Sequence, residues 1–250
     1  HVHAEGYAKE LMNTEGCAVV KVWDPDAAAA NEWARSIGCE SASVEEILAD
    51  PEIEGVVIST ATNEHPDVII KACDAGKAVF TEKVLALTNE DAEAMKAAVI
   101  RNNTRFGISF PHLSESPVMF ALDAVKSGKL GQVNYVRFRK AHNGSTGDWL
   151  PPHFYDPIAC GGGAMIDLGA HPMYLLCELY GKLPEKVQSS FTKVTGKAVE
   201  DNAVSLLEFE GGAIGVSETG FVSLCDPFTL EISGTAGCLR VVGHELTVMS

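Results

Sequence analysis

Short apolar runs alternate with helical patterns over the first 111 residues of this 250-residue chain, and this alternation constrains the fold more than any other feature. Runs rich in Val, Ile and Phe predict strands at 17–23, 55–59, 77–80 and 105–110. Helical patterns long enough to connect parallel strands cover residues 4–13, 26–37, 66–75 and 89–102. We therefore predict an α/β domain with a doubly wound parallel sheet over residues 1–111.

The pattern changes after residue 111. A helix is predicted at 117–127, a long strand at 133–140 and a second helix at 164–180. Apolar and polar residues then alternate, most clearly in Phe228–Ser233, and Glu210–Ala213 has the sequence of a hairpin turn. Further strands are predicted at 185–194, 202–209, 213–219, 228–233 and 238–243. Residues 112–250 are thus predicted to form an α+β domain with an open, mainly antiparallel sheet.

Composition excludes several classes of partner. The chain has 19 Lys and Arg against 34 Asp and Glu, and its formal net charge of −15 repels nucleic acid and anionic membranes. We expect neither as a partner, and no apolar run is long enough for a membrane span. The seven cysteines are scattered without a C-x-x-C pair, which argues against a disulfide framework or zinc ribbon. A cytoplasmic location is expected.

Asp24 follows the apolar run that ends at Trp23. Dinucleotide-binding folds have an acid at this position, where it binds the ribose hydroxyls, although a single Asp can equally be a turn residue or helix cap. That acid normally lies ~20 residues after a glycine-rich phosphate loop. The loop and the first strand would then precede His1, so we expect that the chain lacks them and that residues are missing from its ends.

Two polar segments follow neighbouring predicted strands: Thr60–His65 and Glu82–Lys83. Both would lie at the carboxyl edge of the sheet, where open α/β folds bind ligands. A lysine there can polarise a substrate oxygen or hold a hydroxyl. The alternatives are a polar loop in which Thr62 or Asn63 caps the next helix, and a solvated surface lysine.

The segment Gly161–His171 begins with three glycines, which permit close approach of a ligand or of another backbone segment. Asp167 and His171 are four residues apart and are predicted to share one helix face, as an acid/base histidine and its carboxylate partner would. A surface pair, or a metal site completed by His153 or Glu178, are the alternatives. Since spacing gives no third ligand, we expect no metal.

These segments resemble, in order and spacing, the signatures of the Gfo/Idh/MocA oxidoreductases. The resemblance covers nearly the whole chain and implies an N-terminal Rossmann domain and a C-terminal domain with an open, mostly antiparallel sheet that usually continues beyond residue 250. It also implies dimers or tetramers formed through the open sheet face, although the polar residues from Thr229 to Ser233 do not require that contact.

The resemblance implies a role for each motif residue. The cofactor loop would comprise Thr60, Ala61, Asn63 and His65. The backbone of His1 and Val2 would line the pyrophosphate.

Glu82 and Lys83 correspond to an E-K-P motif, whose lysine lies beside nicotinamide and substrate. Val84 replaces its proline, which is expected to relax the backbone that aims Lys83. Asp167 and His171 correspond to a D-x-G-x-H pair in which the histidine is the acid/base.

The predicted function is an NAD-dependent dehydrogenase that acts on a hydroxyl of a sugar, polyol or inositol-like molecule. Asp24 has no adjacent arginine, so NAD is favoured over NADP. One alternative is a nonredox sugar enzyme, a glycosidase or epimerase, with tightly bound NAD. The other is a noncatalytic nucleotide- or sugar-binding protein.

Substrate contacts are predicted for Lys83, Asp167 and His171. Trp149, His153 and Tyr155 precede the triple glycine and are further candidates for a sugar pocket, or else packing residues at the domain junction.

Overall fold

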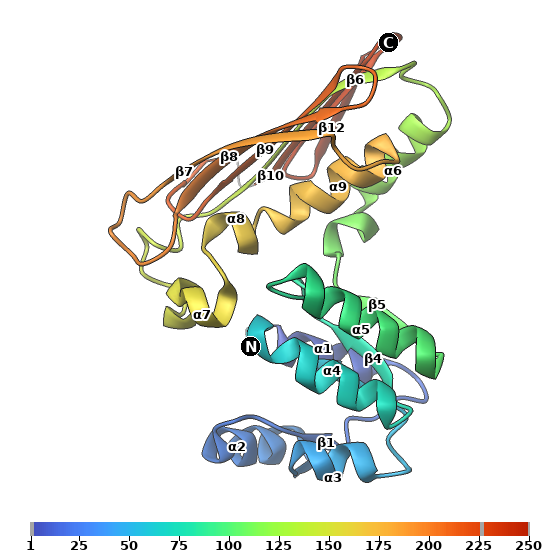
Figure 1. The fold of residues 1–250 in the computed structure, drawn as a ribbon, viewed down its shortest axis with the longest axis vertical. Helices are drawn as coiled ribbons and strands as arrows, with labels where there is room; N and C mark the ends of the chain where they lie inside the picture. Colours follow the sequence, from blue (N-terminus) through green and yellow to red (C-terminus); the bar gives the residue numbers. More distant parts are fainter. Residues whose placement is uncertain (1–2, 226–227, 250) are drawn as a thin grey trace. The chain divides into compact units, whose positions relative to one another are not determined.

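A computed structural model describes residues 3–225 and 228–249 (Figure 1). The chain divides into two compact units, His1–Ser109 and Phe110–Ser250. Within the described ranges, no helix combines the length and apolar character needed to cross a membrane.

The strands of the first unit are all parallel. Strands β1 (Lys21–Val22) and β2 (Glu40–Ser41) form one sheet, and β3 (Gly55–Ile58), β4 (Ala78–Thr81) and β5 (Phe106–Ile108) form another, in that order. The connections contain α1 (Ala4–Asn13), α2 (Ala27–Ile37), α3 (Val44–Ala49), a 3-10 turn η1 (Thr62–Glu64), α4 (His65–Asp74) and α5 (Asn89–Asn102). This confirms the predicted Rossmann-type alternation.

Helices α2, α3 and α5 begin at residues with capping side chains. The Asp26 carboxylate accepts hydrogen bonds from the backbone N–H groups of Ala28 and Ala29, and Thr88 caps α5. Helix α3 was not predicted, although Ser43 and Glu46 form a capping box, a signal that the sequence contains. Strand β2 was also missed because it has two residues and no apolar run. The buried core comprises Ile58, Ile69, Ala72, Cys73, Val79, Met95 and Ala98.

The second unit contains a seven-stranded sheet in the order β12-β11-β10-β6-β9-β8-β7. Its strands are β6 (Val133–Ala141), β7 (Lys186–Thr192), β8 (Asn202–Phe209), β9 (Ala213–Gly220), β10 (Phe228–Gly234), β11 (Cys238–Val242) and β12 (Glu245–Met249). Only the β6–β9 pair is parallel among the paired strands described, so the sheet is mainly antiparallel, as predicted. Gly211 and Gly212 both have positive φ, 84° and 83°, in the predicted hairpin turn. Strand β12 was not predicted.

Helices cover one face of this sheet. Figure 1 shows α6 (Ser116–Lys126), α8 (Ala164–Asp167) and α9 (Ala170–Tyr180) against it. Side chains alternate between buried and exposed along β8, and the core includes Leu175, Leu176, Leu207, Leu230 and Ile232. Thr229 departs from the predicted alternation, since it is 3% exposed between Arg139 on β6 and Val242 on β11. Shorter elements are η2 (Pro111–Ser114), η3 (Pro152–Tyr155) and α7 (Pro157–Cys160).

The single helix predicted at 164–180 is wrong. It is two helices, α8 and α9, separated at Leu168 and Gly169. The backbone turns tightly here: a Cβ on Gly169 would lie 2.2 Å from the carbonyl oxygen of Met165. Asp167 and His171 therefore lie on different helices and not on one continuous helix face.

Candidate active site

Strand register brings two predicted site segments to one edge of the three-stranded sheet. Ile58 at the end of β3 pairs with Thr81 at the end of β4. Because the strands are parallel, Thr60–His65 and Glu82–Lys83 leave the sheet side by side. This edge is where open α/β sheets bind ligands. The Thr60 and Ala61 residues are half-buried there, and Asn63 is exposed.

His65 connects these two segments. Its side chain is 1% exposed, and its Nδ1 lies 3.1 Å from the carbonyl oxygens of both Val84 and Leu85. Since carbonyls only accept, Nδ1 donates. Burial lowers the pKa of His65, and the two carbonyl hydrogen bonds only partly oppose this shift. A neutral, buried His65 thus ties the loop after β3 to the segment that follows Lys83.

Neither Thr62 nor Asn63 caps the next helix, which was the alternative predicted from the sequence. Helix α4 follows η1 directly, and its N-cap position, Glu64, has no side-chain cap.

Glu82 is 2% exposed and is held by donors from distant parts of the first unit. His3 Nδ1 lies 2.8 Å from Oε1, the Tyr7 hydroxyl donates to the same oxygen, and the backbone N–H of Lys83 donates to Oε2 at 3.1 Å. Burial alone would raise the pKa of Glu82, but the His3 and Tyr7 contacts outweigh it and the pKa is lowered. Glu82 therefore anchors α1 beside the backbone that carries Lys83.

Tyr7 completes this buried network. Its oxygen also lies 2.8 Å from the Ser109 hydroxyl, and burial together with Glu82 raises the pKa of Tyr7 to about 12. Neither His3 nor Tyr7 is predicted from the sequence. They lie 79 and 75 residues from Glu82, so no local pattern could have identified them.

Lys83 is half-buried, and its peptide bond to Val84 is cis. Asp24 is also half-buried, and its Oδ1 accepts a hydrogen bond from the backbone N–H of Asp26 at 2.9 Å. Asp24 thus forms the turn that its residue type allows, at the carboxyl side of β1. His1 and Val2, predicted to line the pyrophosphate, lie outside the described residues.

The glycines of Gly161–Gly163 accommodate another backbone segment. A Cβ on Gly163 would lie 2.0 Å from the carbonyl oxygen of Glu200, which accepts from the Ala164 N–H at 3.0 Å. The Glu200 carboxylate accepts from the N–H groups of Gly163 at 3.0 Å and Met165 at 2.9 Å. Glu200, which sequence analysis did not select, fixes the start of the helix that carries Asp167.

His171 lies in a buried cluster of rings. It is 5% exposed, its Nδ1 lies 3.1 Å from the Tyr174 hydroxyl, and its ring meets the edge of His112 at a centroid distance of 4.6 Å. Asp167 is half-buried on the preceding helix. Burial lowers the pKa of His153, and Asp167 opposes that shift, so these two groups interact electrostatically.

The loop before the triple glycine contributes one exposed aromatic ring. Trp149 is 55% exposed, and its Nε1 donates to Asn143 at 3.1 Å. The Tyr155 oxygen accepts from Ser145 at 3.0 Å and Tyr155 packs on the Leu150–Phe221 cluster, which fits a packing role. The exposed His153 stacks on Phe154 at 4.3 Å.

No group of three His, Cys, Asp or Glu side chains that could hold a metal occurs in the described part of the chain. Glu178, considered above as a ligand, forms an ion pair with Lys126 at 2.8 Å.

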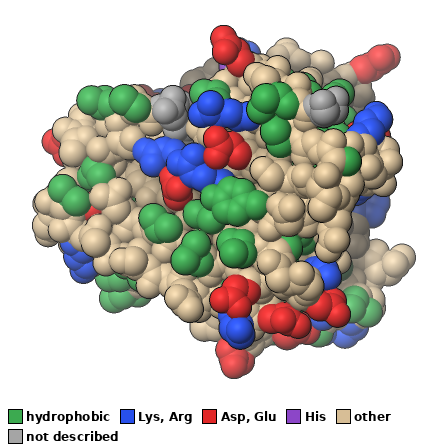
Figure 2. Space-filling view, turned by 90° about the horizontal axis from the view of Figure 1, so that it is seen from above, with side chains coloured by type: hydrophobic (Ala, Val, Ile, Leu, Met, Phe, Trp, Pro, Cys, Tyr) green, Lys and Arg blue, Asp and Glu red, His purple; other side chains and the backbone are tan. Residues whose placement is uncertain are grey.

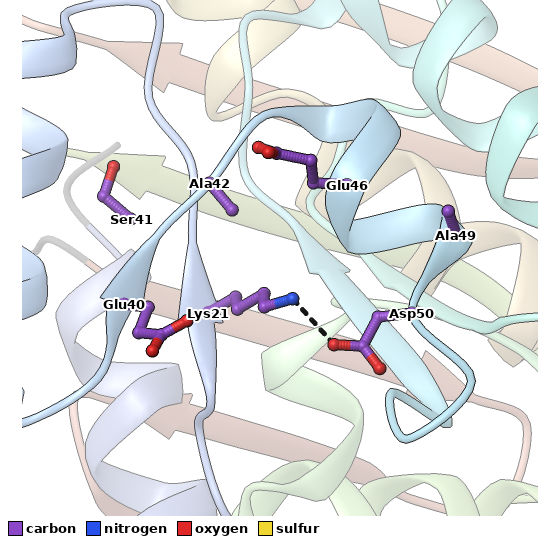
Figure 3. A pocket seen from close by; sticks show the side chains of 7 residues that line it. All are labelled: Lys21, Glu40, Ser41, Ala42, Glu46, Ala49 and Asp50. Atoms are coloured by element: carbon purple, nitrogen blue, oxygen red, sulfur yellow. Dashed lines mark hydrogen bonds and ion pairs between the residues drawn. The ribbon is translucent and has the colours of Figure 1, made fainter.

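A shallow pocket of about 420 Å³ lies elsewhere in the first unit (Figure 3). It is lined by β1, β2, α3 and the residues next to them, and contains none of the predicted site residues. The Lys21 ammonium crosses it to pair with Asp50 at 2.7 Å. This ion pair ties β1 to the end of α3, which is a structural role.

The first unit, with parallel strands and polar loops at their carboxyl edge, has the architecture of a Rossmann-type ligand-binding domain, and the second is an open sheet covered by helices. Residues 3–110 match the family model "Oxidoreductase family, NAD-binding Rossmann fold", and residues 118–240 match the "GFO/IDH/MocA C-terminal domain". The chain belongs to the GFO/IDH/MocA oxidoreductase family, which confirms the resemblance, the oxidoreductase class and NAD as the cofactor.

Named relatives agree with this assignment. The chain is 29% identical to scyllo-inositol 2-dehydrogenase (NAD(+)) of Bacillus subtilis (strain 168), over 98% of this chain and 73% of the relative. It is 31% identical to 1,5-anhydro-D-fructose reductase of Ensifer adhaerens, over 81% of this chain and 61% of that protein. A levoglucosan dehydrogenase solved with NADH and levoglucosan is 25% identical with a TM-score of 0.86, over 98% of this chain and 72% of that one.

Proposed function

We propose that the protein is an NAD-linked dehydrogenase that oxidises a hydroxyl-bearing carbon of a sugar, polyol or inositol-like molecule. The observation that carries this proposal is the pairing of Ile58 with Thr81, which brings the Thr60–His65 and Glu82–Lys83 loops to one sheet edge. The named relatives act on inositols, anhydrosugars or levoglucosan by their names, and they support this class of substrate.

The residues of the first unit fit a dinucleotide. Asp24 and Asp26 begin the turn into α2, where two carboxylates suit a ribose diol and repel a 2′-phosphate. We therefore propose NAD over NADP. Thr60, Ala61 and Asn63 would contribute contacts at the loop after β3, while His65 and Glu82 hold the backbone around Lys83.

Proton transfer is assigned to His171 in the second unit. When bound, NAD supplies the acceptor for the hydride that leaves the substrate carbon. His171, oriented by Asp167, takes the hydroxyl proton, and Lys83 assists by holding the substrate oxygen. Trp149 and His153 are proposed substrate contacts, since the Trp149 ring is exposed and fixed by Asn143.

Fluorescence titration of the 250-residue chain with NADH and with NADPH is the first test. We expect NADH to bind at least tenfold more tightly, and a panel of inositols and sugars to yield NADH from NAD. Turnover without net NADH would indicate the nonredox chemistry instead. Failure to bind either nucleotide would contradict the proposal.

We also propose a homodimer or homotetramer formed through the open sheet face. By register, Val204, Leu206 and Ile214 share this face with the ion pair of Arg137 and Glu218, and the three apolar side chains are 46%, 47% and 41% exposed. Figure 2, which views the molecule from above in Figure 1, shows apolar side chains beside clustered basic and acidic ones. Light scattering should give a multiple of 26.6 kDa, and Leu206→Lys should lower it. A monomeric wild-type mass would contradict this.

A further inference from the structure

His171 and Tyr174 lie one turn apart on α9, and the Tyr174 hydroxyl contacts His171 Nδ1 at 3.1 Å. The imidazole is 5% exposed, so this contact lies in a site where few water molecules can compete for it. The Tyr174 ring is itself held in place by Phe110, with a centroid distance of 4.3 Å. The hydroxyl oxygen is therefore a fixed partner for one nitrogen of His171.

The Tyr174 oxygen can accept a hydrogen bond from His171 Nδ1. Burial raises the pKa of Tyr174, so the phenol stays neutral. A neutral phenol oxygen has two acceptor positions and one donor proton. An acceptor position on this oxygen can therefore take an N–H on His171 Nδ1, which lies 3.1 Å away.

We propose that Tyr174 is a positioning residue for His171, whose neutral imidazole donates its Nδ1 proton to the Tyr174 oxygen and keeps its lone pair on Nε2. The proton-transfer role of His171 in this proposal rests on the proposed function. When the substrate O–H bond breaks, its proton passes to Nε2 of His171. The carbon that carries this hydroxyl would lose its hydride to bound NAD. The Nδ1 proton of His171 stays hydrogen-bonded to the Tyr174 oxygen throughout. His171 therefore has the tautomer with a lone pair on Nε2 both before the step and after the proton is released.

His112 and Glu115 hold the other side of this arrangement. His112 is 4% exposed, its Nδ1 lies 2.7 Å from Glu115 Oε1, and its ring packs on Phe138 and Phe228. These contacts fix the His112 ring that meets His171 edge-on. The partner at His171 Nδ1 is thus a neutral phenol that is rigidly held, and it adds no charge beside the imidazole.

Tyrosine-to-phenylalanine substitutions on α9 give a matched pair. Tyr174→Phe removes only the oxygen at His171. Tyr180→Phe removes a hydroxyl of the same helix that donates to the Ile214 carbonyl at 2.7 Å. The first measurement is the tautomer of His171 by nitrogen NMR, with its signals assigned by their loss in His171→Gln.

We expect the Nδ1–H tautomer of neutral His171 in the wild type and in Tyr180→Phe, and a shift toward Nε2–H in Tyr174→Phe. An Nε2–H wild type, or the same tautomer in all three proteins, would overturn the proposal. If Tyr174→Phe fails to fold, the wild-type tautomer alone decides.

Kinetics on an accepted substrate provide the second measurement. Tyr174→Phe should lose about tenfold or more in kcat with KM within twofold, and Tyr180→Phe should change neither. Equal kcat in the two variants would overturn the positioning role. Because the tautomer is read without turnover, an Nδ1–H wild type that shows no dehydrogenase activity would sink the proposed function and leave the hydrogen-bond assignment standing.

Discussion

The imidazole Nδ1 of His65 lies 3.1 Å from the carbonyl oxygen of Leu85, 20 residues further along the chain. A second contact of equal length reaches Val84. His65, which the resemblance assigns to the cofactor loop, thus forms its hydrogen bonds with the backbone of the segment that follows Lys83. The segments Thr60–His65 and Glu82–Lys83 are therefore held together, and a change in the first should also displace Lys83 in the second.

Replacing His65 should therefore affect both stability and nucleotide binding. His65→Leu leaves the part-buried carbonyls of Val84 and Leu85 without their donor, and we expect a loss of about 1–3 kcal/mol in the free energy of unfolding. His65→Asn retains a donor near Nδ1 and should recover part of it. Urea unfolding and NADH titration measure the two effects, with the exposed His244→Asn as control. A His65→Leu protein as stable as the control would contradict this role.

The lowered pKa of His65 also predicts a pH dependence. Its folded pKa is below the unfolded value of 6.5, so the unfolded state binds the extra proton. Stability is then complete above about pH 7 and falls as the pH decreases through 6.5 toward the folded pKa, by at most about 1.4 kcal/mol per pH unit for this group. Unfolding of wild type and His65→Asn at pH 7.5 and about pH 5.5 should show a smaller loss in the variant. Parallel losses would rule out His65 as the cause.

Adjacent glycines allow a sharp test of the turn that carries Asp167. A Cβ on Gly163 would lie 2.0 Å from the Glu200 oxygen, whereas the nearest atom to a Cβ on Gly162 is at 3.6 Å. Gly163→Ala should cost about 1–3 kcal/mol or more and lower turnover, and Gly162→Ala should stay within about 0.5 kcal/mol. Thermal unfolding compares them directly. If the two variants are equally stable, the backbone at Glu200 can move away from the added Cβ without lowering the free energy of unfolding.

Asp24→Asn tests nucleotide preference. The amide oxygen can still accept from Asp26 N–H, so the turn is kept while the carboxylate charge is lost. We expect the ratio of NADPH to NADH affinity to rise by about tenfold, which corresponds to 1.4 kcal/mol. Asp67→Asn, which removes a surface partner of Lys71, is the matched control. An unchanged ratio in Asp24→Asn would remove this residue from cofactor recognition.

The features that could be predicted from the sequence are those that local periodicity and strand order determine, namely the positions of strands and the faces that their side chains occupy. The strands predicted at 55–59 and 77–80 are found as β3 and β4, with ends shifted by one residue, and the alternation in β8 also follows from such patterns. The break at Gly169 did not, because the apolar spacing on both sides is helical, whereas the Gly169 N–H donates to the Ala164 carbonyl, five residues back. Partners at the site were missed for a similar reason. Glu200 lies 37 residues from Gly163, and such contacts have no signature along the chain.

The contact between Tyr7 and Glu82 provides the last prediction. Tyr7→Phe removes one donor from a carboxylate that is 2% exposed, so the Glu82 pKa should rise and the free energy of unfolding should fall by about 1–3 kcal/mol at pH 7. Glu82 has a lowered folded pKa, so its contribution is present above the unfolded pKa and disappears as the pH decreases through the folded pKa. The difference between wild type and Tyr7→Phe should therefore narrow in acid. Denaturant unfolding at pH 7 and at about pH 4, with Tyr135→Phe on β6 as control, measures it. A difference that is constant across pH would show that the Tyr7 hydroxyl stabilises the protein through Ser109, at 2.8 Å, and not through the Glu82 charge.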